Sequence, residues 1–413
     1  MFIDEILKEK IIERPFYLQR ILNYLNSNVI KVITWMRRVW KSYILKNIIQ
    51  KLVKESFIKP ENIFYVNKED IRWDFITDYK VLNQEFENFI WWKSGKIAVF
   101  LDEVQEIEWW EKFVRSLLTK YKTDVEIFIT WSNSNILSSE LSTYIAGRYV
   151  EIEVFSLSLK EYSKFARKKI SKELFFEYLK YGWLPGIFYM KKEDEIIFSY
   201  LKWIYNTILV KDIVRHFWLR NIDFFENLYK YIFANIWNIF SAKKISDYLK
   251  SQKIKISPET ILNYINFWIK SRVLFQLKSV APDTKKFFEI YNKYYVWDLW
   301  LRNAIVWFSL ARDIGRLLEN YVFLEIKRKW YEIYLWRLKD KTEIDFVIEK
   351  NWIRKYIQVC YLLNSENTIE REFWSLEKIR DNWEKYVVSL DDINFWVRNG
   401  IRHINILDLE KIL

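Results

Sequence analysis

Residues 29–42 read VIKVITWMRRVWKS, and this stretch decides the fold of the amino-terminal part of the chain. Residues 29–34 form an apolar, β-branched run, which predicts a buried strand. Residues 43–56 (YILKNIIQKLVKES) have apolar side chains at helical spacing and predict a helix. The loop between them, 35–42, has tryptophan at positions 35 and 40 and ends in Lys41-Ser42. The order strand, loop, helix is typical of an α/β domain.

The chain is poor in glycine and rich in tryptophan, with 6 Gly and 22 Trp among 413 residues. Glycine ordinarily makes up about 7% of a protein. Many tryptophans stand after predicted strands, in turns or at helix ends, where glycine is favoured because it adopts positive φ and admits close backbone approach. We therefore hypothesise that they stand for glycine, because UGA codons read as glycine in an alternative genetic code were translated as tryptophan. The alternative is a protein that is naturally rich in tryptophan.

With glycine at positions 35 and 40, the loop becomes G-x-x-x-x-G-K-S, the phosphate-binding (Walker A) loop, in its expected place between a strand and a helix. In such a loop the backbone N–H groups surround the β-phosphate, Lys41 contacts the β- and γ-phosphate oxygens, and the Ser42 hydroxyl coordinates Mg²⁺. The two printed indole rings would obstruct this loop. The alternative is a basic surface loop. The predicted ATP-binding residues are Trp35, Met36, Arg37, Arg38, Val39, Trp40, Lys41, Ser42 and Tyr43.

A second motif follows about 60 residues later, where the apolar run Ala98 to Leu101 leads into Asp102 and Glu103. A buried strand that ends in Asp-Glu is the Walker B arrangement. Asp102 is predicted to hold the water shell of Mg²⁺. Glu103 is predicted to be the general base that polarises the attacking water.

A third apolar strand, Ile127 to Thr130, is followed by Ser132 and Asn133, and we expect Asn133 to sense the γ-phosphate. Arg148 precedes the next predicted strand, 149–154, and is a candidate arginine finger, acting in its own subunit or across a subunit boundary of a homo-oligomer. The alternative for Arg148 is a surface ion pair. The predicted catalytic residues are therefore Glu103, Lys41, Asn133 and Arg148, and the predicted metal ligands are Ser42 and Asp102.

Strands that alternate with helices imply a parallel sheet with helices on both faces. Ligands of such sheets bind at the carboxyl ends of the strands. The sequence thus predicts an α/β fold, with a parallel-sheet P-loop NTPase domain over residues 1–160.

Several segments, read with glycine in place of tryptophan, resemble the prokaryotic AAA-superfamily ATPases that carry a conserved C-terminal domain of unknown function. The resemblance runs nearly end to end and implies ATP binding and hydrolysis. The segments are ITWMRRVWKS (33–42), FLDEVQEIEWWEKF (100–113), ITWSNSNILSSELSTYIAGRYVEIEVFSLSLKEY (129–162) and YGWLPG (181–186), with KYYVWDLWLRNAI, LENYVFLEIKRKW, TEIDFVI and YIQVCYLL further on.

The helical pattern of residues 161–235 corresponds to a helical lid over the nucleotide, as the resemblance to the ATPases implies. Residues 236–284 resemble a winged-helix domain. In this segment, Ser257 is a good N-cap with Pro258 at the first helical position, and an apolar run from Val273 to Leu277 follows the helix. Its lysines suit phosphate contacts, although such modules also bind proteins. They are Lys243, Lys244, Lys253 and Lys255.

Residues 285–413 are predicted to form an α+β domain that resembles the restriction-endonuclease core. In that core, acidic residues on neighbouring strands share a metal and a lysine activates water. The corresponding positions are Glu319, Asp345 and Gln358, but Cys360 stands in the position of the lysine. We therefore expect a degenerate nucleic-acid-binding or structural domain rather than an active nuclease.

The chain has 66 Lys+Arg and 54 Asp+Glu, a net charge of +12 and a pI of about 9.2, which favours DNA or RNA as a partner of the basic C-terminal half. The single cysteine, Cys360, excludes an internal disulfide and any multi-Cys zinc site. The two histidines, His216 and His403, argue against a His-rich metal centre. No apolar stretch reaches the ~18 residues that cross a bilayer. The N-terminus is not that of a signal peptide. We expect a cytoplasmic protein without a membrane partner.

The sequence thus predicts a protein that binds ATP and Mg²⁺, hydrolyses ATP and couples hydrolysis to a nucleic-acid or protein partner. One alternative is a nucleotide-gated binding switch with little turnover. A further alternative is a metal-dependent nuclease.

Overall fold

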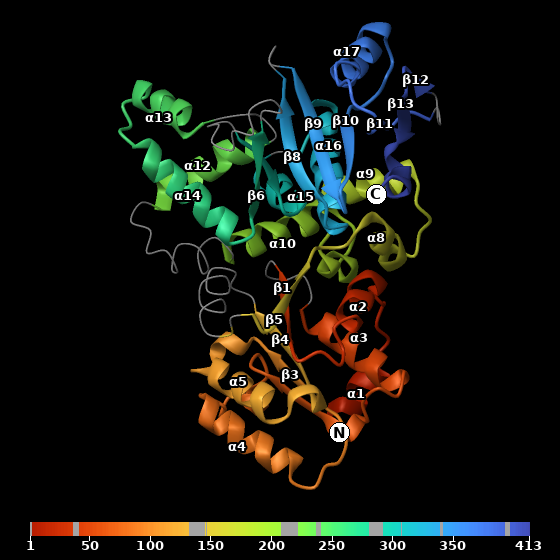
Figure 1. Cartoon of the computed structure of the whole chain (residues 1–413). Helices are drawn as coiled ribbons and strands as arrows, with labels where there is room; N and C mark the ends of the chain where they lie inside the picture. Colours follow the sequence, from red (N-terminus) through yellow and green to blue (C-terminus); the bar gives the residue numbers. More distant parts are fainter. Residues whose placement is uncertain are drawn as a thin grey trace. The chain divides into compact units, whose positions relative to one another are not determined.

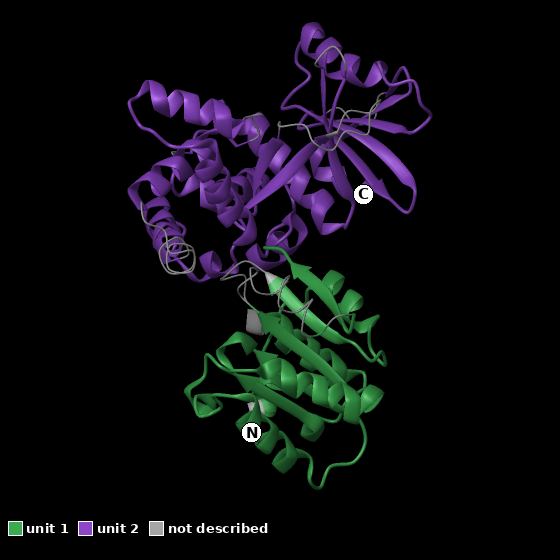
Figure 2. Ribbon diagram, turned by 60° about the vertical axis from the view of Figure 1, so that its left-hand side comes forward, with its two compact units in different colours: residues 1–156 green, residues 157–413 purple. Residues whose placement is uncertain are grey.

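The computed structural model describes residues 2–35, 41–131, 145, 147–207, 222–236, 241–280, 292–306, 308–338, 342–392 and 397–413. The chain forms two compact units, Met1–Ser156 and Leu157–Leu413, which Figure 2 colours separately. The division of the second unit into lid, winged-helix-like and nuclease-like domains stays a prediction.

The first unit contains a five-stranded parallel sheet with the strand order β2-β3-β4-β1-β5 (Figure 1). Its strands are β1 (Ile30–Trp35), β2 (Ile63–Asn67), β3 (Ile97–Asp102), β4 (Val125–Trp131) and β5 (Tyr149–Val154). Its helices are α1 (Phe2–Lys8), α2 (Pro15–Leu22), α3 (Lys41–Lys54), α4 (Tyr79–Ile90) and α5 (Trp110–Lys120), with 3-10 turns at Pro60–Asn62, Ile71–Trp73, Val104–Glu106 and Lys122–Asp124.

The central strands are buried on both faces of this sheet, and every residue of β3 and β4 is buried. Val99 and Leu101 pack with side chains of α4 and α5 on one face, whereas Ala98 and Phe100 pack with those of α1, α2 and α3 on the other. Strands with two covered faces read as continuous apolar runs, which is the pattern in the sequence. The predicted α/β fold with a parallel sheet of the P-loop NTPase type is confirmed.

One charged residue lies inside the first predicted strand. Lys31 is fully buried and forms an ion pair with Glu126 of β4, which is also fully buried. Glu126 also accepts a hydrogen bond from the Asn26 N–H at 2.7 Å and pairs with Lys96 at 2.7 Å. Burial is the largest influence on Lys31 and lowers its pKa, against the attraction of Glu126. The pair satisfies charges that would otherwise be costly in the core.

The second unit contains an eight-stranded mixed sheet with the order β12-β13-β11-β10-β9-β8-β6-β7. Its strands are β6 (Leu274–Val280), β7 (Asn292–Val296), β8 (Glu332–Arg337), β9 (Glu343–Lys350), β10 (Ile353–Val359), β11 (Glu384–Ser389), β12 (Val397–Arg398) and β13 (Ile401–Asn405). Its helices are α8 (Leu159–Ala166), α9 (Lys172–Tyr181), α10 (Asp194–Thr207), α12 (Ile222–Ala234), α13 (Ala242–Ser251), α14 (Pro258–Lys270), α15 (Leu299–Asn303), α16 (Leu310–Arg328) and α17 (Glu366–Glu377), with 3-10 turns at Pro185–Tyr189 and Ile406–Lys411.

The segment predicted to be winged-helix-like contains α13 and α14 followed by the antiparallel pair β6–β7. The N-cap prediction is confirmed, because the Ser257 hydroxyl accepts a hydrogen bond from the Thr260 N–H at 3.1 Å. β6 also pairs in parallel with β8, so this hairpin is part of the larger sheet. The winged-helix assignment itself stays a prediction. Within the described residues, no helix is long and apolar enough to cross a membrane.

Among the residues that the structure describes, three tryptophans have positive φ, a conformation that costs a bulky L-residue free energy. Trp109 has a φ of 57°. Trp330 directly follows the C-cap of α16 and has a φ of 63°, at the helix-end position where glycine is favoured. Trp352 and the preceding Asn351, with φ of 67° and 51°, form the two-residue turn between β9 and β10. Such a turn requires positive φ at both residues and favours Asn-Gly.

Candidate functional site

The predicted nucleotide site lies at the carboxyl edge of the parallel sheet in the first unit. In the strand register, Thr34 of β1 is paired with Trp131 of β4, and Leu101 of β3 with Ile129. Asp102 therefore reaches the same edge as the residues that lead from β1 into α3. The positive end of the dipole of α3 lies at its N-terminus, after Trp35 and the loop, and favours an anion there.

Asp102 is held at this edge by two neighbouring strands. Its side chain is almost fully buried, with 1% of the residue exposed. The Thr130 hydroxyl of β4 donates to Asp102 Oδ1 at 2.5 Å, and the Tyr65 hydroxyl of β2 donates to Asp102 Oδ2 at 3.2 Å. Burial, followed by the nearby Asp102 charge, raises the pKa of Tyr65, which keeps this hydroxyl a donor. The carboxylate of Asp102 is thus fixed in orientation.

Glu103 directly follows β3 in a left-handed conformation, with φ 56° and ψ 50°. This is a strained backbone for a residue with a Cβ. A hydrogen bond from the Glu103 N–H to Thr130 Oγ1, at 2.9 Å, stabilises this backbone conformation. The carboxylate Oε2 accepts a hydrogen bond from Gln105 Nε2 at 2.5 Å. Glu103 is therefore turned out of the strand direction and its side chain is held in place.

Thr130, Tyr65 and Gln105 were not identified as site residues from the sequence. Thr130 and Tyr65 lie inside strands, and their role depends on which strands are neighbours in the sheet. The signal for Thr130 was weak but present, because it is a hydroxyl residue at the end of an otherwise apolar run, 127–130.

The phosphate-binding loop is only partly described. Residues 36–40 lie outside the described part of the chain, as do Ser132 and Asn133, so their predicted roles stay predictions. The backbone places Trp35 at the end of β1, and Lys41 and Ser42 in the first turn of α3, as predicted for such a loop. The Tyr43 hydroxyl accepts a hydrogen bond from the Ile12 N–H, so its side chain is engaged by the segment before α2.

Trp131 ends β4 at this same edge. It is buried, with 3% exposed, and packs edge to face against Trp110 at a centroid distance of 5.4 Å. This indole is part of the core on the side of α4 and α5.

Arg148 lies at the opposite edge of the sheet. Its carbonyl accepts a hydrogen bond from the Ile30 N–H at 2.9 Å, at the start of β1. Ile30 is paired with Tyr149 and Trp35 with Val154. Five residues of strand, about 16 Å, therefore separate Arg148 from the level of the loop, which is more than an arginine side chain spans. An arginine finger acting in its own subunit does not fit this register, and a finger across a subunit boundary stays a prediction.

A second cluster lies in the second unit, where Glu319 of α16, Asp345 of β9 and Gln358 of β10 come together. The Gln358 Oε1 accepts a hydrogen bond from the Asp345 N–H at 3.3 Å, and Gln358 Nε2 donates to Glu372 at 3.1 Å. The Val359 N–H donates to Asp345 Oδ2 at 3.0 Å.

Lys293 of β7 lies between these carboxylates, and the sequence gave no indication of its role. Its Nζ is 3.1 Å from Glu319 Oε1, 3.3 Å from Asp345 Oδ1 and 3.8 Å from Glu343 Oε2. Only 6% of Lys293 is exposed. Burial lowers the pKa of Lys293, but the carboxylates of Glu319, Asp345 and Glu343 outweigh burial and raise it above the ordinary lysine value. An ammonium therefore lies where the resemblance implies a metal ion.

Neither Cys360 nor Lys355 supplies a second cation to this cluster. Burial raises the pKa of the Cys360 thiol well above its usual range, so Cys360 is neutral. Lys355 donates to the Ile412 carbonyl at 2.7 Å and pairs with Glu384 at 3.4 Å, so its ammonium is engaged outside this cluster. Within the described residues, no group of three or more His, Cys, Asp or Glu side chains is arranged to hold a metal ion.

The chain is similar to known families over most of its length. An AAA domain matches residues 27–163, and two domains of unknown function follow, DUF8612 at 172–312 and DUF4143 at 314–409. This confirms the predicted AAA domain with a C-terminal region of unknown function. The restriction-endonuclease-like assignment and the reading of tryptophan as glycine stay predictions.

Two relatives extend over nearly the whole chain. The uncharacterized protein MJ1544 of Methanocaldococcus jannaschii is 33% identical over 430 residues, which cover 98% of this chain and 90% of that protein. An uncharacterized protein of Haemophilus influenzae is 29% identical over 406 residues, covering 97% of this chain and 99% of that protein. Among solved structures, the ORC2 protein of Aeropyrum pernix matches 78% of this chain and 98% of its own at 10% identity, with a TM-score of 0.37, which is too low to support an inference.

Proposed function

The chain belongs to the family of uncharacterized proteins that includes MJ1544 of Methanocaldococcus jannaschii, and from this premise we propose that it binds ATP with Mg²⁺ and hydrolyses it. The observation that carries the proposal is the buried pair Asp102 and Glu103 at the carboxyl edge of the sheet. Both are fixed by Thr130, on the edge where β1 leads into α3. This is the edge at which ligands of parallel sheets bind.

The donor chemistry of this edge fits a magnesium nucleotide. Mg²⁺ takes oxygen ligands and is usually bound by one or two carboxylates together with substrate phosphates, so a dedicated cage of protein ligands is not required. We assign Asp102 and Ser42 to Mg²⁺ and Lys41 to the β- and γ-phosphate oxygens. When bound, the ion neutralises charge that develops on the transferred phosphoryl group.

Glu103 is assigned as the general base. Its position directly after Asp102 and its left-handed backbone direct its side chain differently from that of Asp102. The hydrogen bonds to its backbone and side chain limit its movement, and catalysis benefits from a base that is already positioned. Asn133 would sense the γ-phosphate, and Arg148 of one subunit would stabilise the transition state in a neighbouring subunit of a homo-oligomer.

A nucleotide-gated switch with little turnover is the second candidate, and one contact favours it. Gln105 Nε2 donates to Glu103 Oε2 at 2.5 Å, so an amide occupies a lone pair of the proposed base. A carboxylate that is stabilised in this way is a weaker base. In this reading, ATP changes the shape of the protein and releases a partner, and hydrolysis is slow until Gln105 moves.

The proposed partner is a nucleic acid or a protein bound by the second unit. Residues 157–413 hold 44 of the 66 Lys+Arg and 32 of the 54 Asp+Glu, so the whole net charge of +12 lies there. This charge attracts polyanions. A metal-dependent nuclease is disfavoured, because Lys293 lies between Glu319 and Asp345.

Glu103→Gln separates the two leading candidates. In protein with glycine at positions 35 and 40, an ATPase should lose about 10²–10⁴-fold in kcat and keep its affinity for Mg·ATP, because a general base acts on the chemical step. Glu106→Gln is the matched control, since Glu106 is an exposed carboxylate three residues away. Unchanged turnover in Glu103→Gln would contradict the assignment. Faster turnover in Gln105→Ala would support gating of the base.

A further inference from the structure

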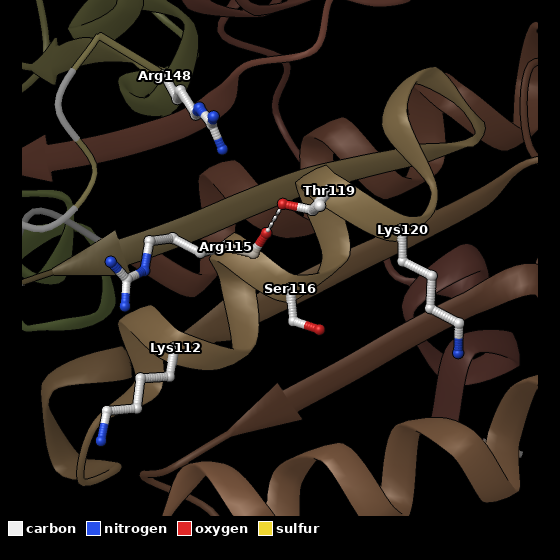
Figure 3. Close-up of a pocket in the computed structure, with 6 residues that line it drawn as sticks. All are labelled: Lys112, Arg115, Ser116, Thr119, Lys120 and Arg148. Atoms are coloured by element: carbon white, nitrogen blue, oxygen red, sulfur yellow. Dashed lines mark hydrogen bonds between the residues drawn. The ribbon is translucent and has the colours of Figure 1, made fainter.

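A basic groove of about 470 Å³ lies along helix α5 of the first unit (Figure 3). Four of the residues that line it are cationic and two carry hydroxyl groups. They are Lys112, Arg115, Ser116, Thr119 and Lys120 of α5, and Arg148 just before β5. No carboxylate and no aromatic ring is among these six. Arg148 lies just before the start of β5, at the edge of the sheet opposite the carboxyl ends of the strands.

The groove follows from the helical pattern of α5. Phe113, Val114, Leu117 and Leu118 are buried against the sheet, and the residues between them are exposed on the other side of the helix. From Lys112 to Lys120 the helix rises about 12 Å. The positive charges are therefore spread along a line rather than gathered at one point.

The four cationic side chains of the groove differ in their contacts with other residues of the protein. Within the described part of the chain, neither Arg115 nor Arg148 forms an ion pair. Lys112 lies over the rings of Trp109 and Tyr79, at 4.3 and 5.1 Å from their centroids. Lys120 is 2.9 Å from Glu87, and both side chains are about half exposed. Exposed pairs of this kind are weak and exchange readily for another anion.

The charge of the groove is local. Residues 1–156 contain 22 Lys+Arg and 22 Asp+Glu, so the first unit has no net charge. A neutral unit does not attract polyanions as a whole. The positive charge on one face of α5 is therefore complementary to a ligand with negative charges arranged along a line.

We propose that this groove binds the phosphodiester backbone of a nucleic acid. Arg115 and Arg148 present guanidinium groups, which contact phosphate oxygens in pairs. The Ser116 hydroxyl lies between the cations in Figure 3 and is a further donor. Contacts with phosphate position a nucleic acid and do not read its sequence. None of the six lining side chains carries an aromatic ring on which bases would stack. The proposal does not rest on ATP hydrolysis.

The test compares the full-length protein with Arg115→Ala/Lys120→Ala. Both residues are exposed and neither is assigned to catalysis. Lys10→Ala/Lys54→Ala is the matched control, because it removes the same charge from exposed sites of the same unit. Fluorescence anisotropy measures binding of a labelled single-stranded DNA, the same sequence as duplex DNA, and an RNA, without nucleotide, over a range of salt concentrations.

The expected result is weaker binding and a smaller salt dependence in the groove variant alone. Each lost phosphate contact removes about 0.7–0.9 from the slope of log K against log salt, so the defect should shrink about tenfold between about 50 and 200 mM salt. The arm with the largest loss identifies the natural form of the nucleic acid. Equal affinity and slope in all three proteins would overturn the proposal. A change of oligomeric state in sedimentation, with nucleic-acid binding unchanged, would overturn it in favour of a contact between copies of this chain.

Discussion

Replacing Lys293 by methionine tests whether an internal ammonium completes the carboxylate cluster of the second unit. The Lys293 Nζ is 3.1, 3.3 and 3.8 Å from carboxylate oxygens of Glu319, Asp345 and Glu343. At an effective dielectric constant of about 20, each distance corresponds to about 4–5 kcal/mol of attraction. Desolvation and repulsion among the carboxylates cancel most of this. Removal of one partner of a buried pair costs about 3–5 kcal/mol.

The assay is denaturant unfolding of full-length protein, with a signal that reports the second unit. Lys278→Met is the matched control, because Lys278 is exposed on β6 and its loss should change stability by less than about 0.5 kcal/mol. Burial raises the pKa of Glu319 in the folded state, against the attraction of Lys293. A raised folded pKa means that protonation favours the folded state, so acidification should reduce the cost of Lys293→Met as pH falls towards the ordinary Glu pKa of about 4.3.

The same variant addresses the metal site. With the ammonium removed, Glu319 and Asp345 become available to a cation, and Mn²⁺ should raise the stability of Lys293→Met but not that of the wild type. A cost below about 1 kcal/mol, or a cost that does not change with pH, would refute the electrostatic reasoning. Stabilisation of the wild type by Mn²⁺ would show that Lys293 does not take the place of a metal.

Three further substitutions test the fold. Trp352→Gly should stabilise the protein by about 1 kcal/mol, because it relieves a positive φ in the turn after Asn351, and a loss of stability would contradict the reading of this residue as glycine. Gly182→Ala should prevent folding or destabilise strongly, since a Cβ there would lie 2.5 Å from the Trp300 Cβ, and near-neutral unfolding curves would contradict this. Glu126→Gln should cost about 3–5 kcal/mol by leaving Lys31 buried without its counter-ion, as measured by thermal and denaturant unfolding.

The fold of the first unit was predictable because its central strands are buried on both faces. β3 reads as an uninterrupted apolar run, and the acidic pair 102–103 marks its end. The order of the strands in the sheet could not be predicted from the sequence. The contacts of Thr130 and Tyr65 with Asp102 depend on that order and were therefore not predicted. Lys31 interrupts the first apolar run. Its partner Glu126 lies 95 residues later in the chain, so the ion pair that makes its burial possible cannot be read from the local sequence.

The carboxylate cluster of the second unit also depends on contacts between residues far apart in the sequence. The resemblance identified Glu319, Asp345 and Gln358. It placed the lysine of the cluster at the position of Cys360, on the strand of Gln358, whereas the structure has Lys293 on β7. Lys293 comes from a strand at the edge of the sheet, and only the tertiary structure brings it to the carboxylates. Arg148 directly precedes β5, which in a parallel sheet places it at the edge opposite the carboxyl ends, and the pairing of β1 with β5 agrees with this.

The coding DNA bears on the tryptophans at glycine-like positions. UGA codons at Trp35, Trp40, Trp131, Trp330 and Trp352, with UGG at positions such as Trp110, would support the reading as glycine. UGG codons at all of these positions would refute the hypothesis that the tryptophans stand for glycine.

The central claim is that the carboxyl edge of the first sheet binds a magnesium nucleotide, and calorimetry tests it most directly. Trp35→Gly/Trp40→Gly protein should bind Mg·ATP with a Kd in about the range of 1 μM–1 mM that is common for enzyme substrates. Adding Lys41→Ala should remove the binding, because Lys41 contacts the phosphates. No heat of binding in the Trp35→Gly/Trp40→Gly protein, or equal binding after Lys41→Ala, would contradict the account.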